Sequence, residues 1–206
     1  MLKKESEILH LFAKEPWKRY TFTELQKAAH KKSKSYLALV LKKLVTNGIL
    51  IQEPVGHLPV YALNTSSTKT QVTAGFVLEH DAWNKKHIPY RDLQEAINKI
   101  SVKGCIFLIT GSYARNQQRD DSDIDIVIII EDSAEPKKTI AELSHFCEMN
   151  IPPMHLYVFR NKDFLEMLLN NQFNYGKEIA KNHLILKGGQ TYLKLMDEVI
   201  RHGYKG

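Results

Sequence analysis

Two short groups of residues in the middle of the sequence have side chains that could bind a phosphate and a metal ion. Gly111 and Ser112 follow an apolar run, and Asp123 and Asp125 stand one residue apart at the start of another. Side chains alternate between the faces of a strand, so both aspartates are expected on one face. Carboxylates completed by substrate phosphates are typical ligands of Mg²⁺. The spacing predicts a metal site beside a phosphate-binding turn; the alternative is two aspartates that only solvate a strand end.

The elements that must position these residues are two β-rich runs joined by a short connection. The run "CIFLIT", residues 105–110, ends at Gly111, where the missing side chain lets the backbone approach a ligand closely. The turn presents backbone N–H groups and the Ser112 hydroxyl to an anion, and Arg115 and Arg119 supply charge for a polyphosphate. In "SDIDIVIII" the isoleucines at even positions point away from the aspartates and anchor a second strand in the core.

The stretch "GSYARNQQRDDSDIDIVI", residues 111–128, resembles the signature of the DNA polymerase β-type nucleotidyltransferase superfamily, in its minimal nucleotidyltransferase branch. That signature reads G-S-x-A-R-G, a spacer, and then S-D-I-D followed by a hydrophobic residue. The resemblance extends over roughly residues 90–205, since "FNYGKEIAKNHLILKGGQTYLKL" is similar to the C-terminal helical segment of that group.

The resemblance implies a nucleoside triphosphate as substrate, with ATP as the expected one, and Mg²⁺ as cofactor. Gly111 and Ser112 would hold the triphosphate, and Asp123 and Asp125 would bind the metal as catalytic residues. The reaction would transfer NMP to an acceptor hydroxyl and release pyrophosphate, by in-line attack on the α-phosphorus.

Two positions depart from the pattern of this family. Asn116 replaces a glycine, which is a mild change because asparagine tolerates the left-handed conformation. The family carries a third carboxylate on a following strand. The matching position in this sequence, in the predicted strand "MHLYVF", is His155, and neither Glu148 nor Asp163 stands at that position. A neutral imidazole accepts a proton but is a poor ligand for Mg²⁺. His155 is therefore either a catalytic base or a histidine packed in a strand.

The first third of the sequence has the element order of a winged helix-turn-helix, and this resemblance covers about residues 3–63. "ESEILHLFAKEP" has helical apolar spacing, and "YTFTELQKAAH" offers Thr23 as an N-cap. "YLALVLKKLVTNGIL" predicts a third helix that stops at Asn47-Gly48. "ILIQEPVGHLPVYAL" then has the pattern of a hairpin.

The third helix would be the recognition helix, whose N-terminal residues face the major groove of DNA. The alternative is a helical module used for protein contacts or dimerisation. The residues expected to contact DNA lie around the start of that helix and at the hairpin tip: Lys31, Lys32, Ser33, Lys34, Ser35, Tyr36 and His57.

The distribution of charge along the sequence agrees with DNA binding by the N-terminal third. Residues 1–70 carry 12 Lys and Arg against 5 Asp and Glu, which leaves 17 against 18 for residues 71–206. A basic N-terminal third beside a nearly neutral remainder of the chain favours contact with an anion such as nucleic acid. The alternative is that the surplus lysines only keep the protein soluble.

The sequence thus predicts an α+β protein of two domains. A winged helix-turn-helix domain covers residues 1–66, and a helical linker covers residues 67–89. A nucleotidyltransferase-like domain, a small mixed sheet with flanking helices, covers residues 90–206. The polar stretch "NTSSTKTQ" marks the linker, and the helical pattern of residues 72–100 breaks near Pro89.

Three further segments read as amphipathic helices after the predicted strand at residues 154–159. One of them, "YGKEIAKNHLIL", is expected to be helical up to residue 186, and Gly188-Gly189 separates it from the last. Lys177 and Lys181 on this helix either line the nucleotide pocket or are simply solvated.

Composition argues against several other classes of protein. The longest apolar run is interrupted by Asp125 and is too short to span a bilayer, and the charged start lacks the apolar core of a secretory signal. Cys105 and Cys147 lack the spacing of a zinc site or a disulfide framework. A cytoplasmic location without membrane contact is expected.

The sequence leaves three functions open. The first is a transferase that a winged helix brings to DNA or to a partner protein, with an acceptor that the sequence does not identify. The second is a DNA-binding transcriptional regulator whose nucleotidyltransferase-like domain senses nucleotide or has lost catalysis. The third is a toxin–antitoxin component that acts on a partner protein. A homodimer is expected, because winged-helix DNA binders are often dimeric.

Overall fold

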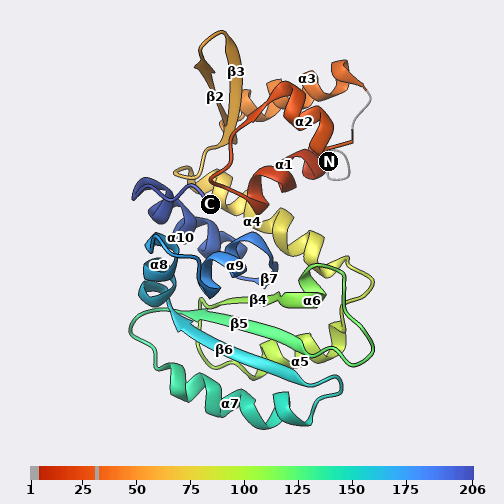
Figure 1. The fold of residues 1–206 in the computed structure, drawn as a ribbon, viewed down its shortest axis with the longest axis vertical. Helices are drawn as coiled ribbons and strands as arrows, with labels where there is room; N and C mark the ends of the chain where they lie inside the picture. Colours follow the sequence, from red (N-terminus) through yellow and green to blue (C-terminus); the bar gives the residue numbers. More distant parts are fainter. Residues whose placement is uncertain (1–4, 31–32) are drawn as a thin grey trace.

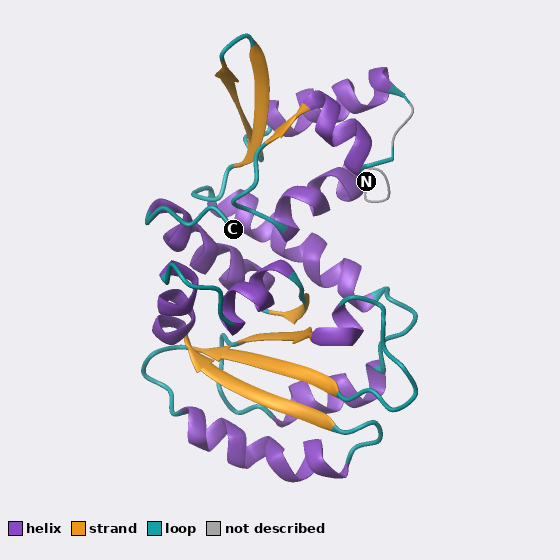
Figure 2. Ribbon diagram, in the orientation of Figure 1, coloured by secondary structure: helices purple, strands orange, loops and turns teal. Residues whose placement is uncertain are grey.

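The structure of the protein is a computed structural model that describes residues 5–30 and 33–206 (Figure 1). The strands, orange in Figure 2, form two separate sheets, one in each part of the chain. A long helix, α4 (Thr68–Trp83), lies between the two parts. Within the described residues, no helix is both long enough and apolar enough to span a bilayer.

The N-terminal part contains three helices and a small antiparallel sheet. Its elements are α1 (Glu5–Lys14), β1 (Tyr20–Thr21), α2 (Phe22–Ala28), α3 (Lys34–Thr46), β2 (Leu50–Val55) and β3 (Leu58–Leu63). Strand β3 lies between β1 and β2 and pairs antiparallel with both. Three helices and a hairpin occur in the expected order, and assignment of this part to the winged-helix class stays a prediction.

Helix α2 begins earlier than its sequence pattern predicts. Its N-cap is Thr21, whereas the sequence favoured Thr23. The Thr21 hydroxyl accepts a hydrogen bond from the Glu24 backbone N–H, and the Glu24 carboxylate accepts one from the Thr21 backbone N–H at 2.7 Å. This reciprocal capping box satisfies two backbone N–H groups at once, which explains why the helix starts there.

Helix α4 joins the two parts of the molecule because it packs against elements of both. It contacts α1 of the N-terminal part and, on the other side, β7 (Leu184–Lys187) and α10 (Gly189–Arg201). Gly75 permits the contact with α10, because a Cβ there would lie 2.4 Å from the backbone nitrogen of Gln190. Buried residues of both parts therefore belong to one hydrophobic cluster, and a second cluster lies in the C-terminal part, where α5 and α7 cover the sheet.

The C-terminal part is built on a four-stranded mixed sheet. Its strands are β4 (Ile106–Thr110), β5 (Ile124–Ile130), β6 (Met154–Arg160) and β7, in the spatial order β6-β5-β4-β7. Strand β4 is antiparallel to β5 and β7, whereas β5 and β6 are parallel. The remaining helices are α5 (Tyr90–Lys99), α6 (Gly111–Ala114), α7 (Pro136–Met149), α8 (Asn161–Leu169) and α9 (Tyr175–Lys181). A small mixed sheet with flanking helices is thus present as expected.

The two faces of this sheet are covered by different helices, as Figure 1 shows. The isoleucines at positions 124, 126, 128 and 130 pack with α5 and α7. Val127 and Ile129, on the opposite face, pack with α4, α8, α9 and α10. This alternation confirms the prediction that the four isoleucines anchor β5 in the core, and it shows that Val127 and Ile129 are buried as well.

The predicted helix over residues 175–186 is wrong in its second half. Helix α9 ends at Lys181, and residues 184–187 form β7, which pairs with β4. The run "LILK" is short and aliphatic, so its periodicity alone does not distinguish a strand from a helix. The open edge of β4 decides, because it offers backbone hydrogen-bond partners to an extended segment.

Candidate functional site

The Gly-Ser turn lies directly at the end of β4. Gly111 has a φ of +67°. A Cβ on this residue would also lie 2.1 Å from the Asp125 Oδ2 atom. Both facts require glycine, since the left-handed conformation disfavours other residues and the carboxylate leaves no space. Asn116, which ends the turn, also has a positive φ of 55°, in agreement with the tolerance expected for asparagine.

The two aspartates flank the first residue of β5 and face the same cavity. Asp123 immediately precedes the strand, and Asp125 lies opposite Thr110 in the pairing of β4 with β5. Burial raises the pKa of the Asp125 carboxyl; His155 opposes this shift, and the charge of Asp123 adds to it. The ionised form of Asp125 is thus costly in the absence of a cation.

His155 lies beside both aspartates. In the parallel pairing of β5 with β6 it stands opposite Asp125. Its Nε2 atom is 3.3 Å from Asp123 Oδ2, and its Nδ1 atom is 3.6 Å from Asp125 Oδ1. The side chain is 56% exposed, so it is not a histidine enclosed in the core. An imidazole therefore stands next to the carboxylate pair, within reach of a bound ligand.

These residues line one cavity of about 640 Å³, here called the Gly111–Asp125 cavity. All four residues predicted to bind nucleotide and all three predicted catalytic residues face it. Its full lining is Thr110, Gly111, Ser112, Arg115, Gln117, Arg119, Asp121, Ser122, Asp123, Asp125, His155, Tyr157, Tyr175 and Glu178. Four carboxylates and two guanidinium groups thus surround the space.

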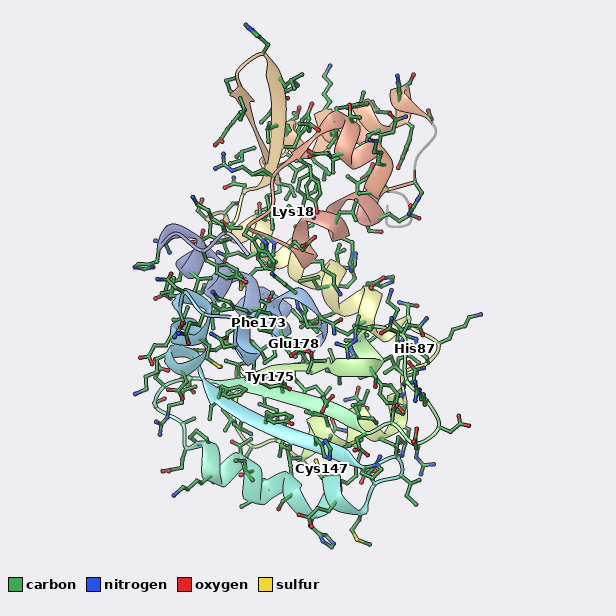
Figure 3. The ribbon with its side chains drawn as sticks, in the orientation of Figure 1. Lys18, His87, Cys147, Phe173, Tyr175 and Glu178 are labelled. Atoms are coloured by element: carbon green, nitrogen blue, oxygen red, sulfur yellow. The ribbon has the colours of Figure 1, made fainter. Side chains whose placement is uncertain are left out.

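Half of the lining residues were missed by reasoning from the sequence, and three of them come from β6 and α9. Tyr157 follows His155 by two positions on β6, so strand alternation could have placed it on the same face. Tyr175 and Glu178 come from α9 (Figure 3), the helix on which the sequence offered Lys177 and Lys181 as possible lining residues, but no sequence pattern indicates that these two side chains face the cavity instead. The Tyr157 and Tyr175 ring centroids are 5.0 Å apart. Burial, and then the charge of Asp125, raises the pKa of the Tyr175 phenol.

Two side chains of the α9 region hold the turn in place. The Glu178 carboxylate lies 3.6 Å from the Arg115 guanidinium, a pair that is partly exposed on both sides and hence weak. Asn182, which ends α9, donates from Nδ2 to the Gly111 carbonyl at 3.3 Å, and its own carbonyl accepts from the Thr110 hydroxyl at 2.6 Å. The loop between α9 and β7 therefore supports the backbone of the Gly-Ser turn.

Other candidate residues lie outside the cavity. Glu148 is exposed near the end of α7, and Asp163 accepts a hydrogen bond from the Arg160 backbone at the far end of β6 from His155. Neither supplies the missing third carboxylate. Lys177 and Lys181 also do not line this cavity.

The residues predicted to contact DNA are distributed around α3 and the hairpin tip. Ser33 is the N-cap of α3 and accepts a hydrogen bond from the Tyr36 backbone N–H at 3.3 Å. Lys34, Ser35 and His57 are exposed, and Tyr36 is partly buried. Lys31 and Lys32 lie outside the described residues.

Among residues 5–30 and 33–206, no group of three or more His, Cys, Asp or Glu side chains is arranged to hold a metal ion. The two carboxylates and the imidazole at the mouth of β5 therefore do not form a complete protein cage.

Residues 93–185 match the family model of a nucleotidyltransferase domain. This segment includes the Gly-Ser turn, both aspartates, His155 and α9. No curated protein and no solved structure matches the chain. The match supports the nucleotidyltransferase superfamily for this part of the molecule, and with it NMP transfer as the general chemistry of the class.

Proposed function

We propose that the protein is an Mg²⁺-dependent nucleotidyltransferase that moves NMP from a nucleoside triphosphate, with ATP as the expected one, to an acceptor hydroxyl. The observation that carries this proposal is the convergence of the Gly111-Ser112 turn, the Asp123/Asp125 pair and His155 on one cavity. The close approach of Gly111 to Asp125 supports it further, because the turn proposed to bind phosphate then lies against the carboxylate proposed to bind the metal.

The charge of the cavity supports a requirement for divalent cations. Four carboxylates against two arginines would repel a triphosphate that entered alone. Two adjacent carboxylates fit Mg²⁺, which usually takes one or two carboxylates from the protein and completes its shell with phosphates and water. A bound cation would also offset the cost of ionising Asp125. When bound, the metal would supply charge stabilisation to the phosphates during transfer.

The side chains of the cavity have separate roles in this proposal. Ser112 and the Gly111 backbone bind the triphosphate, and Arg115 and Arg119 compensate its charge. The acceptor oxygen bonds to the α-phosphorus while the bond to the bridging oxygen of the β-phosphate breaks and pyrophosphate leaves. The acceptor proton passes to the imidazole of His155, the residue that occupies the position of the family's third carboxylate.

Incubation with α-labelled ATP and Mg²⁺ tests this proposal. We expect label on an acceptor, and we expect Asp123→Asn and Asp125→Asn each to lower the transfer rate at least about 100-fold, as typically follows removal of a preorganised electrostatic group. Asp132→Asn, an exposed aspartate after β5, is the matched control. Label transfer that survives in both cavity variants would refute the proposed roles.

A second candidate function is that of a DNA-binding transcriptional regulator that senses nucleotide. The observation that favours it is a direct link between the two parts of the chain. The Lys14 ammonium of α1 donates to the His183 carbonyl at 2.9 Å, and the preceding residue, Asn182, holds the Gly111 turn. Nucleotide bound at the turn would thus act on the N-terminal part through residues 182–183, with a winged helix as the DNA-binding element.

Mobility-shift titrations distinguish this function from the first. A regulator of this kind binds duplex DNA with an affinity that changes when Mg-ATP is added, and Lys14→Met reduces that change. Equal DNA affinity with and without Mg-ATP would eliminate the sensing function but leave the transferase proposal untouched.

A further inference from the structure

A separate cavity of about 230 Å³ lies where α1, the second half of α3 and the first half of α4 meet. We call it the Leu44 cavity. Helices α1 and α4, which form two of its walls, pack against each other (Figure 1). Among the described residues, the linings of this cavity and of the Gly111–Asp125 cavity have no member in common. A ligand in the Leu44 cavity would therefore occupy a different site from the nucleotide.

The inner wall of the Leu44 cavity is apolar. It consists of Leu9, Leu44, Ile49 and Val77. These four side chains belong to the hydrophobic cluster shared by both parts of the chain, and 3–8% of each remains exposed, whereas Phe12 of the same cluster is at 0%. Protein interiors are close-packed and leave few voids larger than a water molecule. The four partly exposed side chains therefore surround a space that the core of the protein does not fill.

The volume of this space limits the size of a ligand. An apolar cavity of about 150 Å³ is large enough to bind benzene. Sites for drug-sized ligands occupy about 300–1,000 Å³. The Leu44 cavity lies between these values, so a single six-membered ring with a short side chain fits it.

The rim of the cavity carries a surplus of positive charge. Lys43 is neutralised by Glu5, whose carboxylate lies 2.7 Å from the ammonium. Lys69 donates a hydrogen bond to the Asn47 carbonyl, a neutral acceptor, at 3.0 Å. Asn47 is the C-cap of α3, and the C-terminal end of a helix carries about half a negative charge. About half a positive charge thus remains beside the apolar space, which favours one anionic group on the ligand.

We infer that the Leu44 cavity binds a small carboxylic acid with a single apolar ring. The ring packs against Leu44 and Val77, and the carboxylate accepts a hydrogen bond from Lys69. An ammonium group has three N–H donors, so Lys69 keeps its bond to Asn47 when the ligand is present. The ligand would contact both α3 and α4, the helix that joins the two parts of the chain. This inference goes beyond both proposed functions and depends on neither.

Isothermal titration calorimetry with 3-phenylpropionate tests the site in the whole chain. We expect a dissociation constant below about 1 mM, which an efficient ligand of this size reaches. Thr73→Phe should weaken binding at least about tenfold, because the added ring occupies the cavity that Thr73 lines. The matched control is Val72→Phe, at an exposed position of the same helix outside the lining, which should not change the affinity. Melting curves establish that both variants are folded.

A neutral analogue tests the role of the charge. 3-Phenylpropanamide has the same shape, and we expect it to bind the unmodified protein about threefold more weakly, since the ion pair that it lacks lies at an exposed rim. Lys69→Gln should remove the difference between acid and amide. Lys42→Gln, at an exposed position of α3 outside the lining, should preserve it.

Several results would contradict this inference. Absence of binding to the unmodified protein, or equal binding by Thr73→Phe and Val72→Phe, would overturn the site. Equal affinity for the acid and the amide would overturn the assignment of a carboxylate. Asp123→Asn/Asp125→Asn should bind the acid as the unmodified protein does. Weaker binding by that variant, or displacement of the acid by Mg-ATP, would place the ligand in the Gly111–Asp125 cavity instead.

Discussion

The Gly111–Asp125 cavity and the exposed start of α3 are built in opposite ways. In the cavity, side chains from β4, α6, β5, β6 and α9 converge, and single atoms are in close contact, as between Gly111 and Asp125. Around α3, Lys34 and Ser35 extend from one helix end into solvent, and His57 stands apart at the hairpin tip. Convergent side chains suit chemistry at one atom, whereas a dispersed basic surface suits contact with a repeating charge.

The largest effect is expected in the Gly111–Asp125 cavity, when alanine replaces the glycine that lies against Asp125. Gly111→Ala should lower nucleotidyl transfer by about 100-fold or more, because the Cβ displaces the Asp125 carboxylate and small misplacements in a reacting site have effects of this size. Transfer rates and Mg-nucleotide affinity measured by calorimetry provide the test.

Gly104→Ala is the control for this prediction. Gly104 has a similar φ of +70°, but no atom lies within 4 Å of the position of its Cβ. Both variants carry the backbone strain of about 1–2 kcal/mol, so only the contact with Asp125 differs. Equal loss of transfer in the two variants would show that strain alone matters and would contradict the proposed geometry.

The stability of the protein should depend on pH through His183, which lies where the N-terminal part meets the C-terminal part. Burial lowers the pKa of His183 from 6.5 to about 3, while its carbonyl accepts the Lys14 hydrogen bond. The unfolded chain takes up a proton below pH 6.5 and the folded chain does not, so stability falls as the pH falls from 6.5 towards 3. The expected loss is about 2 kcal/mol at pH 5.

Urea unfolding from pH 8 to pH 4 measures this effect. His183→Gln should remove the acid-dependent loss that belongs to this residue, whereas His57→Gln, at the exposed hairpin tip, should not change it. A His183→Gln profile parallel to that of the unmodified protein would refute the assignment.

His155→Asp should raise the affinity of the Gly111–Asp125 cavity for Mg²⁺. A third carboxylate beside Asp123 and Asp125 adds attraction for Mg²⁺ of about 2–8 kcal/mol at about 4 Å, between the values for water and a protein surface and twice those for two unit charges. Because the position is more than half exposed, we expect about a tenfold gain in Mg²⁺ affinity, measured by calorimetry and by the rise in melting temperature with Mg²⁺. His155→Asn removes the imidazole without adding charge, and an equal gain in that variant would exclude the explanation.

The smallest effect should come from the dispersed surface. Lys34→Ala should reduce the slope of log DNA affinity against log salt by about 0.9, the value for one phosphate contact on duplex DNA, and should weaken binding equally for all sequences. Lys162→Ala, an exposed lysine of α8, is the control for general charge. A slope unchanged by Lys34→Ala would favour protein contacts as the role of α3.

Much of the C-terminal part could be predicted because its signals are local. The alternation along "SDIDIVIII" predicted a strand anchored in the core by its even-numbered isoleucines, and the glycine at position 111 predicted a close approach of the backbone. The helix assigned to residues 184–186 was wrong because a short aliphatic run has no periodicity of its own. The N-cap of α2 was misplaced because Thr21 and Glu24 form a reciprocal capping box. Each side chain accepts a hydrogen bond from the backbone N–H of the other residue, so two N–H groups are satisfied instead of one.

By itself, the sequence determined which residues are candidates for the chemistry: the Gly-Ser turn, the two aspartates and the surplus of lysines near the start of the chain. Only the tertiary structure decided that His155 stands opposite Asp125 and that Tyr175 and Glu178 line the same cavity. The physical reason is the range of the interactions. Periodicity and turn chemistry are properties of neighbouring residues, whereas the pairing of β6 with β5 and the position of α9 depend on packing between segments far apart in the chain.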